Sequence, residues 1–286
     1  MSLLTPRTLL LVDLALEEDA GLGDVTSRAI FSDRHRSRAR IEARQSLVIC
    51  GLEVAAHVFS RVDPRLRISL RARDGDRLEN GDIALEVSGP TSSLLTAERT
   101  ALNFLQRLSG VATLARRFAD AVPTGPTRIV DTRKTTPGFR ALEKYAVRCG
   151  GCANHRSSLG EHVLIKDNHI AAAGSLERAV AAARKAAPHT AKIAVEAASA
   201  ADVRSACRAR AEVILLDNMT PAQIDEAVKV IGGRAIVEIS GGVRLETVAS
   251  FARPGIDVIS VGALTHSAPA ADLSLTVLPE KRRRRR

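Results

Sequence analysis

Residues 131–169 read DTRKTTPGFRALEKYAVRCGGCANHRSSLGEHVLIKDNH, and this stretch concentrates cations, small residues and turn residues. Arg133 and Lys134 follow the β-like run at 127–130, and Lys166 follows the run at 163–165. His155 and Arg156 follow the glycine pair at 150–151. If the runs at 127–130 and 163–165 are parallel strands, these side chains project from strand ends into one cleft. Cations gathered in this way suit a small polyanion that bears carboxylates and phosphates.

Short β-branched runs recur from residue 127 onward, with helical segments between them. They lie at 128–130, 163–165, 192–195, 213–216, 235–237 and 257–259. The segments at 175–187 and 221–231 have helical spacing and begin with Ser or Thr-Pro, which is typical of helix N-termini. This alternation predicts a parallel sheet wound by helices, either open or closed into a barrel.

The residues at the strand ends favour the barrel. Each run finishes in a polar or small residue: Asp131, Lys166, Glu196, Asp217, Glu238 with Ser240, and Ser260 with Gly262. In a barrel these residues all converge on one face, whereas an open sheet gathers them only at its switch point. No G-x-G-x-x-G follows a first strand, which argues against dinucleotide binding. We therefore predict an α/β barrel with few obvious strands.

The N-terminal part, 1–109, has a different pattern. A helical segment at 9–18 precedes strand-like segments at 38–49 and 66–70. The turns Asp74-Gly75-Asp76 and Asn80-Gly81-Asp82 suggest hairpins. We predict an α/β sandwich domain at 1–109 that precedes a barrel domain at 110–271.

Composition limits the classes of function. No apolar run approaches the eighteen or so residues that span a bilayer, and Asp13 interrupts the N-terminal apolar run, so we expect a soluble, cytoplasmic protein with no membrane partner. Residues 281–286 supply six of the ten excess positive charges, and aromatic residues form 2% of the chain. We therefore expect a disordered polybasic tail at 279–286 and no specific nucleic-acid partner. A polyanion-binding module that uses the tail is an alternative.

Four cysteines occur: Cys50, Cys149, Cys152 and Cys207. Cys149 and Cys152 form a C-x-x-C, but no second pair accompanies it and no thioredoxin-like sequence surrounds it. We expect reduced thiols that bind no metal.

Several of these motifs together resemble the quinolinate phosphoribosyltransferases, also called nicotinate-nucleotide pyrophosphorylases (carboxylating). The resemblance rests on the 131–169 stretch and on ERTALN at 98–103, LDNM at 216–219, SGG at 240–242 and SVGALTHS at 260–267. It extends from about residue 23 to 275. It implies an N-terminal α/β sandwich followed by an irregular, incomplete, type II phosphoribosyltransferase-like α/β barrel, with 272–278 returning to the first domain.

The family reaction joins quinolinate to phosphoribosyl pyrophosphate and yields nicotinate mononucleotide, pyrophosphate and carbon dioxide, a step of de novo NAD synthesis. The alternative within this fold is a molybdenum-operon phosphoribosyltransferase-like protein that acts on another base. The intact runs 154–156 (NHR) and 164–169 (LIKDNH) favour quinolinate. Such an enzyme must clamp a dicarboxylate, neutralise pyrophosphate and stabilise positive charge on the ribose.

The resemblance assigns site residues. Catalytic roles fall to Lys134, Lys166, Glu196 and Asp217, and Glu196 with Asp217 would hold Mg²⁺, directly or through water. Arg133, His155 and Arg156 would clamp the carboxylates, joined by Arg99 from a neighbouring subunit. Further substrate contacts are expected from Thr132, Ser240, Gly241, Gly242, Ser260, Val261, Gly262 and Ala263. The enzyme would be a homodimer with shared active sites, and further assembly of dimers is left open.

Two positions depart from the family pattern. Cys152 stands where a third glycine is usual, next to the turn that presents the NHR motif. Ala194 replaces the first acid of a Glu-x-Glu pattern, while Glu196 keeps the second. We expect activity to survive because Glu196 matches the catalytic acid. His169 is expected to be a structural hydrogen-bonding residue.

Overall fold

The computed structural model describes residues 3–123 and 125–279, and it divides into two compact units. The N-terminal unit holds the chain up to residue 116, together with 137–151 and the residues from 268 onward. The barrel unit holds 117–136 and 152–267. Of the polybasic tail at 279–286 that was expected to be disordered, residues 280–286 lie outside the described residues. Among the residues that are described, no helix combines the length and apolar character needed to cross a bilayer.

The N-terminal unit contains a four-stranded antiparallel sheet in the order β12-β1-β5-β3. Its strands are β1 (Arg36–Ala43), β3 (Arg67–Leu70), β5 (Ile83–Pro90) and β12 (Leu273–Leu278). In β1, Ala39 and Ile41 are buried while Arg38 is exposed, which is the alternation expected of a sheet with one face covered. The chain's last strand, β12, pairs with its first.

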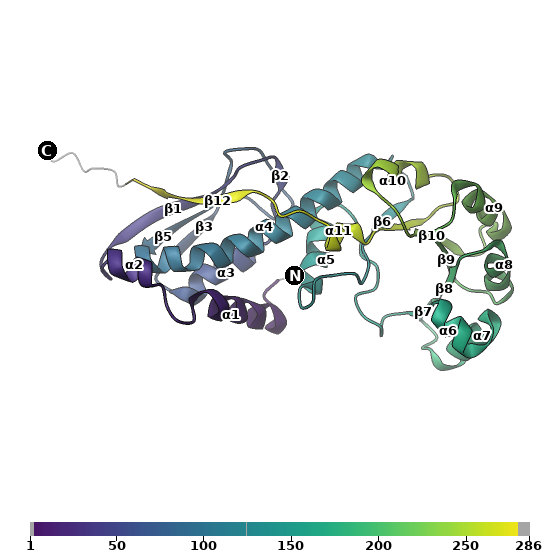
Figure 1. Cartoon of the computed structure of the whole chain (residues 1–286). Helices are drawn as coiled ribbons and strands as arrows, with labels where there is room; N and C mark the ends of the chain where they lie inside the picture. The colour runs from purple at the N-terminus through teal and green to yellow at the C-terminus, as the bar shows by residue number, and fades with distance from the viewer. Residues whose placement is uncertain (1–2, 124, 280–286) are drawn as a thin grey trace. The chain divides into compact units, whose positions relative to one another are not determined.

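Helices cover one face of this sheet (Figure 1). They are α1 (Pro6–Ala20), α2 (Val25–Ile30), α3 (Leu52–Val62) and the first part of α4 (Thr91–Ala121), whereas α5 (Arg140–Cys149), a further helix of this unit, does not lie on the sheet. Side-chain caps fix two of their starts: Thr5 accepts a hydrogen bond from Thr8 N, and Asp24 accepts one from Ser27 N. Phe59 of α3 and Leu105 of α4 are fully buried in the core.

The predicted hairpins in this unit were wrong, although both turns form. Gly75 and Gly81 adopt left-handed backbone conformations, with φ of 96° and 94°. The short strand between the turns, β4 (Arg77–Leu78), pairs with β2 (Leu47–Val48), whereas β5 pairs with β1 and β3. The eight-residue β5 forms more ladder hydrogen bonds with β1 than it could form with the two-residue β4. Each turn therefore reverses the chain without joining two paired strands.

The barrel unit contains a six-stranded parallel sheet in the order β6-β11-β10-β9-β8-β7. Its strands are β6 (Arg128–Val130), β7 (Val163–Ile165), β8 (Ile193–Ala197), β9 (Val213–Asp217), β10 (Ile236–Ser240) and β11 (Val258–Ser260). Figure 1 shows the strands curving with helices outside them. All six predicted strands are present, and the sheet ends at β6 and β7. The prediction of an incomplete barrel is confirmed.

The helices of this unit connect or follow its strands from β7 onward. They are α6 (Asp167–Ala173), α7 (Leu176–Ala186), α8 (Ala200–Arg208), α9 (Pro221–Ile231), α10 (Leu245–Phe251) and α11 (Ala263–His266). The Ser and Thr-Pro starts act as predicted: Ser175 caps α7, and Thr220 forms a capping box with Gln223. The parallel register places Ser240 opposite Asp217, so polar strand ends meet along one edge.

Candidate active site

A cavity of about 1120 Å³ opens at the carboxyl ends of the barrel strands, and we call it the strand-end cavity. Fifteen of the sixteen predicted site residues line it: Thr132, Arg133, Lys134, His155, Arg156, Lys166, Glu196, Asp217, Ser240, Gly241, Gly242, Ser260, Val261, Gly262 and Ala263. They come from all six strand ends and from the 152–162 loop. The sixteenth, Arg99, is exposed on α4 in the N-terminal unit.

A buried carboxylate at the end of β6 anchors the NHR motif. Asp131 is fully buried and accepts hydrogen bonds from Asn154 Nδ2 at 2.6 Å and from His155 N at 2.9 Å. Ala153 also joins the β6 ladder, since its N–H donates to Ile129 O at 2.8 Å. The loop that carries His155 and Arg156 is thereby fixed to the strand.

The His155 ring is held at both nitrogens. Nδ1 accepts a hydrogen bond from Arg156 N at 2.8 Å, and Nε2 lies 3.3 Å from Glu238 Oε1. The Ser260 hydroxyl donates to the same carboxylate oxygen, and Glu238 is buried. An Nδ1 that accepts a hydrogen bond carries no proton, so the ring proton sits on Nε2 and faces Glu238.

Arg156 brings a second guanidinium into the cavity beside Arg133. Its Nη1 donates to His162 O at 3.0 Å, and its side chain is nearly buried. Burial, followed by the nearby Arg133 charge, lowers the pKa of Arg156 below its ordinary value, yet a guanidinium stays charged near neutrality. An anion bound between Arg133 and Arg156 would relieve their mutual repulsion.

Lys166 and Glu196 form an ion pair across adjacent strand ends. Lys166 Nζ lies 2.5 Å from Glu196 Oε1, and both side chains retain exposure to the cavity. The backbone of Lys166 is fixed by His169, whose Nδ1 accepts a hydrogen bond from Lys166 N at 3.0 Å. The structural role predicted for His169 is confirmed.

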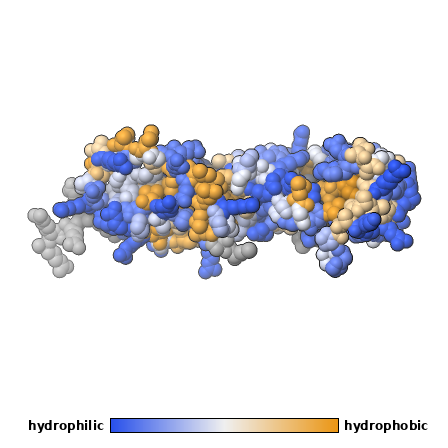
Figure 2. All heavy atoms as spheres, turned by 90° about the horizontal axis from the view of Figure 1, so that it is seen from below, coloured by the Kyte–Doolittle hydropathy of each residue, from blue (hydrophilic) through white to orange (hydrophobic). Residues whose placement is uncertain are grey.

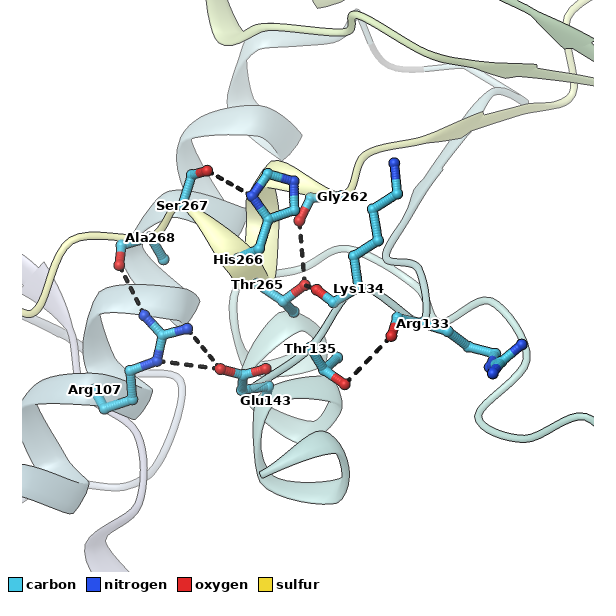
Figure 3. Close-up of polar contacts among 10 residues, drawn as sticks. All are labelled: Arg107, Arg133, Lys134, Thr135, Glu143, Gly262, Thr265, His266, Ser267 and Ala268. Atoms are coloured by element: carbon cyan, nitrogen blue, oxygen red, sulfur yellow. Dashed lines mark hydrogen bonds and ion pairs between the residues drawn. The ribbon is translucent and has the colours of Figure 1, made fainter. Parts of the chain in front are cut away.

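Lys134 lies against α11. Thr265 Oγ1 donates to Lys134 O at 2.7 Å (Figure 3). Lys134 N donates to Thr132 Oγ1 at 3.0 Å. A Cβ added at Gly262 would stand 3.1 Å from Lys134 Cδ and 3.1 Å from His266 Nε2. The lysine stem therefore passes over a position where a side chain would crowd it, and its exposed end is directed away from Arg133 (Figure 3).

The SGG motif forms a tight turn after β10. Gly241 has φ of 89°, and a Cβ there would lie 2.2 Å from Asn218 Oδ1. Asn218 has a φ of 52° and donates its backbone N–H to Ser240 O at 3.0 Å. Only glycine fits at 241, because the backbone is left-handed and the Asn218 side chain occupies the adjacent space.

Among the substrate contacts predicted after β11, Val261 has a backbone amide that already makes a hydrogen bond within the sheet. Val261 N donates to Val130 O at 2.9 Å, so this amide is engaged in the β6–β11 ladder. Gly262 and Ala263, which begin α11, are the amides of that segment left to contact a phosphate.

Several residues that line the cavity were not among the predicted site residues, and Asn218 and Arg244 are two of them. Asn218 stands in the LDNM motif, where its left-handed backbone could not be anticipated, and Arg244 stands at the N-cap position of α10. Arg244 follows the SGG turn at a helix start, where a cation is not typical, and no motif marked it. Among the described residues, no cluster of three or more His, Cys, Asp or Glu side chains forms a metal site. Glu196 and Asp217, at the ends of neighbouring strands, offer two carboxylates at most.

A buried ion pair organises the N-terminal unit near α5. Arg107 Nη2 donates to Glu143 Oε1 at 2.6 Å, and its Nη1 donates to Ala268 O at 2.9 Å (Figure 3). Glu143 is fully buried, so the guanidinium satisfies a charge that would otherwise be costly. This pair ties three segments of that unit together.

Comparison with known proteins identifies the family. A model described as the quinolinate phosphoribosyl transferase N-terminal domain matches residues 24–109, and the corresponding C-terminal domain model matches residues 111–276. The chain belongs to the quinolinate phosphoribosyltransferase family. The predicted resemblance is confirmed over nearly the whole chain.

Relatives agree with this placement. A Bacillus subtilis protein named "probable nicotinate-nucleotide pyrophosphorylase (carboxylating)" is 42% identical over 260 residues, which covers 91% of this chain and 90% of that protein. A Nicotiana tabacum quinolinate phosphoribosyltransferase (decarboxylating) 1b is 39% identical over 285 residues and covers 93% of this chain and 81% of that protein.

Solved structures of the family have the same fold. The crystal structure of NadC from Streptococcus pyogenes has a TM-score of 0.92 and 41% identity, covering 98% of this chain and 100% of that one. Nicotinate-nucleotide pyrophosphorylase from Ehrlichia chaffeensis has a TM-score of 0.91 and 34% identity, covering 97% and 99%.

The two departures from the quinolinate phosphoribosyltransferase pattern are accommodated differently. A Cβ at Gly150 would lie 2.4 Å from Ala112 O, and Gly151 has φ of 94°, so both positions require glycine. Cys152, in contrast, is buried without a left-handed backbone. Ala194 is buried within β8, so a carboxylate there would have to be desolvated and the alanine removes that cost.

Proposed function

We propose that this protein transfers the phosphoribosyl group of phosphoribosyl pyrophosphate to quinolinate, releasing pyrophosphate and carbon dioxide and forming nicotinate mononucleotide for de novo NAD synthesis. The single observation that carries the proposal is that Arg133, Arg156, Lys134 and Lys166 all line one cavity of a family member. A dicarboxylate and a polyphosphate are the ligands for which such a set of cations is suited.

The carboxylate clamp falls to Arg133 and Arg156. Both guanidiniums line the strand-end cavity, and Arg156 is aimed by its bond to the His162 carbonyl. Planar guanidinium forks match carboxylates in pairs of parallel hydrogen bonds. His155 is engaged with Glu238 and Arg156 N, so we assign it to shaping the clamp, with its ring edge as a further contact to quinolinate.

Lys134 and Lys166 are assigned to the phosphates. As the bond from the ribose carbon to pyrophosphate breaks, negative charge collects on the leaving group and positive charge on the ribose. The two ammonium groups stabilise the negative charge on the leaving pyrophosphate, while Glu196 and Asp217 stabilise the positive charge on the ribose. Lys166 must exchange part of its contact with Glu196 for phosphate oxygens, and both groups retain the exposure for this exchange.

Magnesium is a proposed cofactor, and the two carboxylates in the strand-end cavity are ligands of the kind it takes. Mg²⁺ keeps several waters and is usually held by one or two carboxylates plus substrate phosphates. Glu196 and Asp217, at adjacent strand ends, would be the carboxylates that hold it, directly or through water. When bound it would neutralise pyrophosphate charge.

The 5′-phosphate is assigned to the backbone turns at the last strand ends. We assign it to Ser240, Gly241 and Gly242 together with Gly262 and Ala263, and Ser260 and Thr132 line the same cavity. Backbone amides at such turns and helix starts are common phosphate sites in barrels.

A homodimer with shared active sites is part of the proposal, as is a cytoplasmic location. Arg99 is exposed on α4 and would reach the strand-end cavity of a partner subunit. The helices α1 and α2 and the turn between them expose large apolar side chains: Leu10, Leu14, Leu22, Val25 and Ile30. Figure 2 shows hydrophobic side chains on the surface of this unit, and exposed apolar groups of this extent favour a protein interface. The proposed dimer leaves room for further association of dimers into a larger oligomer.

One assay tests the proposal. Purified full-length protein with quinolinate, phosphoribosyl pyrophosphate and Mg²⁺ should form nicotinate mononucleotide and release carbon dioxide in equal amounts. Product from nicotinate but none from quinolinate would overturn the substrate assignment. No nucleotide from either acid would favour the alternative of a paralogue acting on another base.

A further inference from the structure

Two cysteines of the N-terminal unit, Cys50 and Cys149, are brought together by the turn at 74–76. The Asp74 carboxylate accepts hydrogen bonds at 3.0 Å from Gly51 N and from Leu52 N. Its other oxygen accepts a hydrogen bond from Tyr145 Oη at 3.1 Å. One side chain thus connects the backbone just after Cys50 to a residue of α5.

The geometry of α5 extends this contact to the second thiol. Tyr145 and Cys149 are four residues apart, so they lie on the same face of the helix. Gly75 N donates to Ile49 O at 2.9 Å, and a Cβ at Gly75 would stand 3.6 Å from Cys149 O. Each thiol is also the largest single cause of the shift in the other's pKa, which requires the two side chains to lie near each other.

The two thiols differ in exposure. Cys50 is completely buried, and its backbone N–H donates to Ser109 Oγ at 3.0 Å. Cys149 ends α5 and is only half-buried. A reagent from solvent therefore meets Cys149 first, with Cys50 behind it.

We propose that Cys149 and Cys50 form a dithiol site that a hydroperoxide oxidises reversibly to a disulfide. In the first step Cys149 sulfur attacks one peroxide oxygen, the O–O bond breaks, and Cys149 becomes a sulfenic acid. In the second step Cys50 sulfur attacks that sulfur, the S–S bond forms, and the S–O bond breaks. With hydrogen peroxide, two thiols and one peroxide give one disulfide and two waters.

The environment of each sulfur supports this division of roles. The hydrogen bond with Cys50, aided by Tyr145 and Arg148 against the effect of burial, lowers the pKa of the Cys149 thiol. The hydrogen bond with Cys149, burial and the Asp74 charge raise the pKa of Cys50. A thiol with more thiolate reacts first with peroxide, so Cys149 is the attacking residue and Cys50 the one that resolves the sulfenic acid.

The test uses wild-type full-length protein and needs no variant. After treatment with stoichiometric hydrogen peroxide, remaining thiols are alkylated and the protein is digested without reduction for mass spectrometry. We expect a peptide containing Cys50 linked to one containing Cys149, and its disappearance after dithiothreitol. Because the bridge joins residues about a hundred positions apart, the melting temperature of the oxidised protein should rise by on the order of 5 °C.

Two variants sharpen the result. In Cys50→Ser, Cys149 should accumulate as a sulfenic acid that a dimedone probe labels, because its resolving partner is gone. Cys152→Ser should leave the Cys50–Cys149 link unchanged. Cys207, half-buried on α8 in the barrel unit, reports nonspecific oxidation within the same digest.

The proposal fails if peroxide consumes Cys149 in the wild-type protein without a link to Cys50. It also fails if the dominant product joins Cys149 to Cys152, as the C-x-x-C spacing alone would suggest. Both outcomes are measured on the cysteine thiols and not on turnover, so they are independent of whether the proposed enzymatic function is correct.

Discussion

His155 Nε2 lies 3.3 Å from the buried carboxylate of Glu238, which also accepts the Ser260 hydroxyl. This relationship joins the 152–162 loop to the ends of β10 and β11. Since Nδ1 accepts the Arg156 amide, Glu238 fixes the ring in the tautomer with its proton on Nε2. Glu238 is thus a positioning residue for the carboxylate clamp.

Substituting Glu238→Gln should raise the KM for quinolinate more than that for phosphoribosyl pyrophosphate. Loss of a charge-assisted hydrogen bond costs about 1.5 to 3 kcal/mol, which corresponds to a rise in KM of roughly one to two orders of magnitude. Nitrogen NMR of the His155 ring should show loss of the single tautomer. Ser260→Ala removes one hydrogen bond to Glu238 but keeps its charge, so the His155 ring should keep its single tautomer. An unchanged ring spectrum in Glu238→Gln would contradict the positioning role.

Arg133→Ala and Arg156→Ala should each weaken quinolinate binding much more than phosphoribosyl pyrophosphate binding. Losing a charge-assisted hydrogen bond to a carboxylate should lower the affinity for quinolinate by about one to two orders of magnitude. Calorimetry with each ligand alone measures both effects. Arg133→Lys retains the charge but not the planar fork, so an intermediate loss is expected. Equal losses for the two ligands would refute the division of labour.

Glu196→Gln should lower turnover by at least an order of magnitude while the fold stays intact. The Lys166–Glu196 pair is partly exposed, so its contribution to stability is small and thermal melts should move little. Glu212→Gln, which breaks a similarly exposed pair with Arg184, is the matched control and should leave turnover unchanged. The same tests apply to Lys134→Ala, Lys166→Ala and Asp217→Ala. Wild-type turnover and Mg²⁺ dependence in both acid variants would rule out their catalytic role.

His162 should make the protein less stable in mild acid. Burial, then the neighbouring His155 and Arg156, lowers the pKa of His162 from its ordinary 6.5. The unfolded chain therefore binds a proton at a pH where the folded protein does not, and stability falls as pH drops below about 6.5 until the folded pKa is reached. In His162→Gln, urea unfolding at pH 7 and 5 should show a smaller loss. An identical loss would assign the pH dependence to other groups.

Much of the barrel and of the cavity lining could be predicted from the sequence. Regular βα spacing locates all six strands, and the Thr-Pro start with a following glycine locates α9. Polar residues at strand ends then converge because parallel register aligns those ends. These are local or periodic signals, which a single sequence carries well.

The long-range contacts could not be predicted in the same way. The pairing of β4 with β2 depends on competition between strand partners, which turn residues do not encode. The bonds from Glu238 to His155 and from Asp131 to Asn154 join positions far apart in sequence. Their geometry follows only once strand order and register are known.

The assembly prediction concerns Arg99. This residue is exposed on α4 of the N-terminal unit, whereas Lys134 lines the strand-end cavity of the barrel unit. If a two-fold dimer shares its sites, Arg99 of one subunit serves the cavity of the other. Arg99→Ala and Lys134→Ala should each be nearly inactive alone. After equal mixing and subunit exchange, heterodimers carry one intact site and one doubly altered site, so about a quarter of wild-type activity should return. Exchange verified by native mass spectrometry without recovered activity would show that Arg99 acts within its own chain.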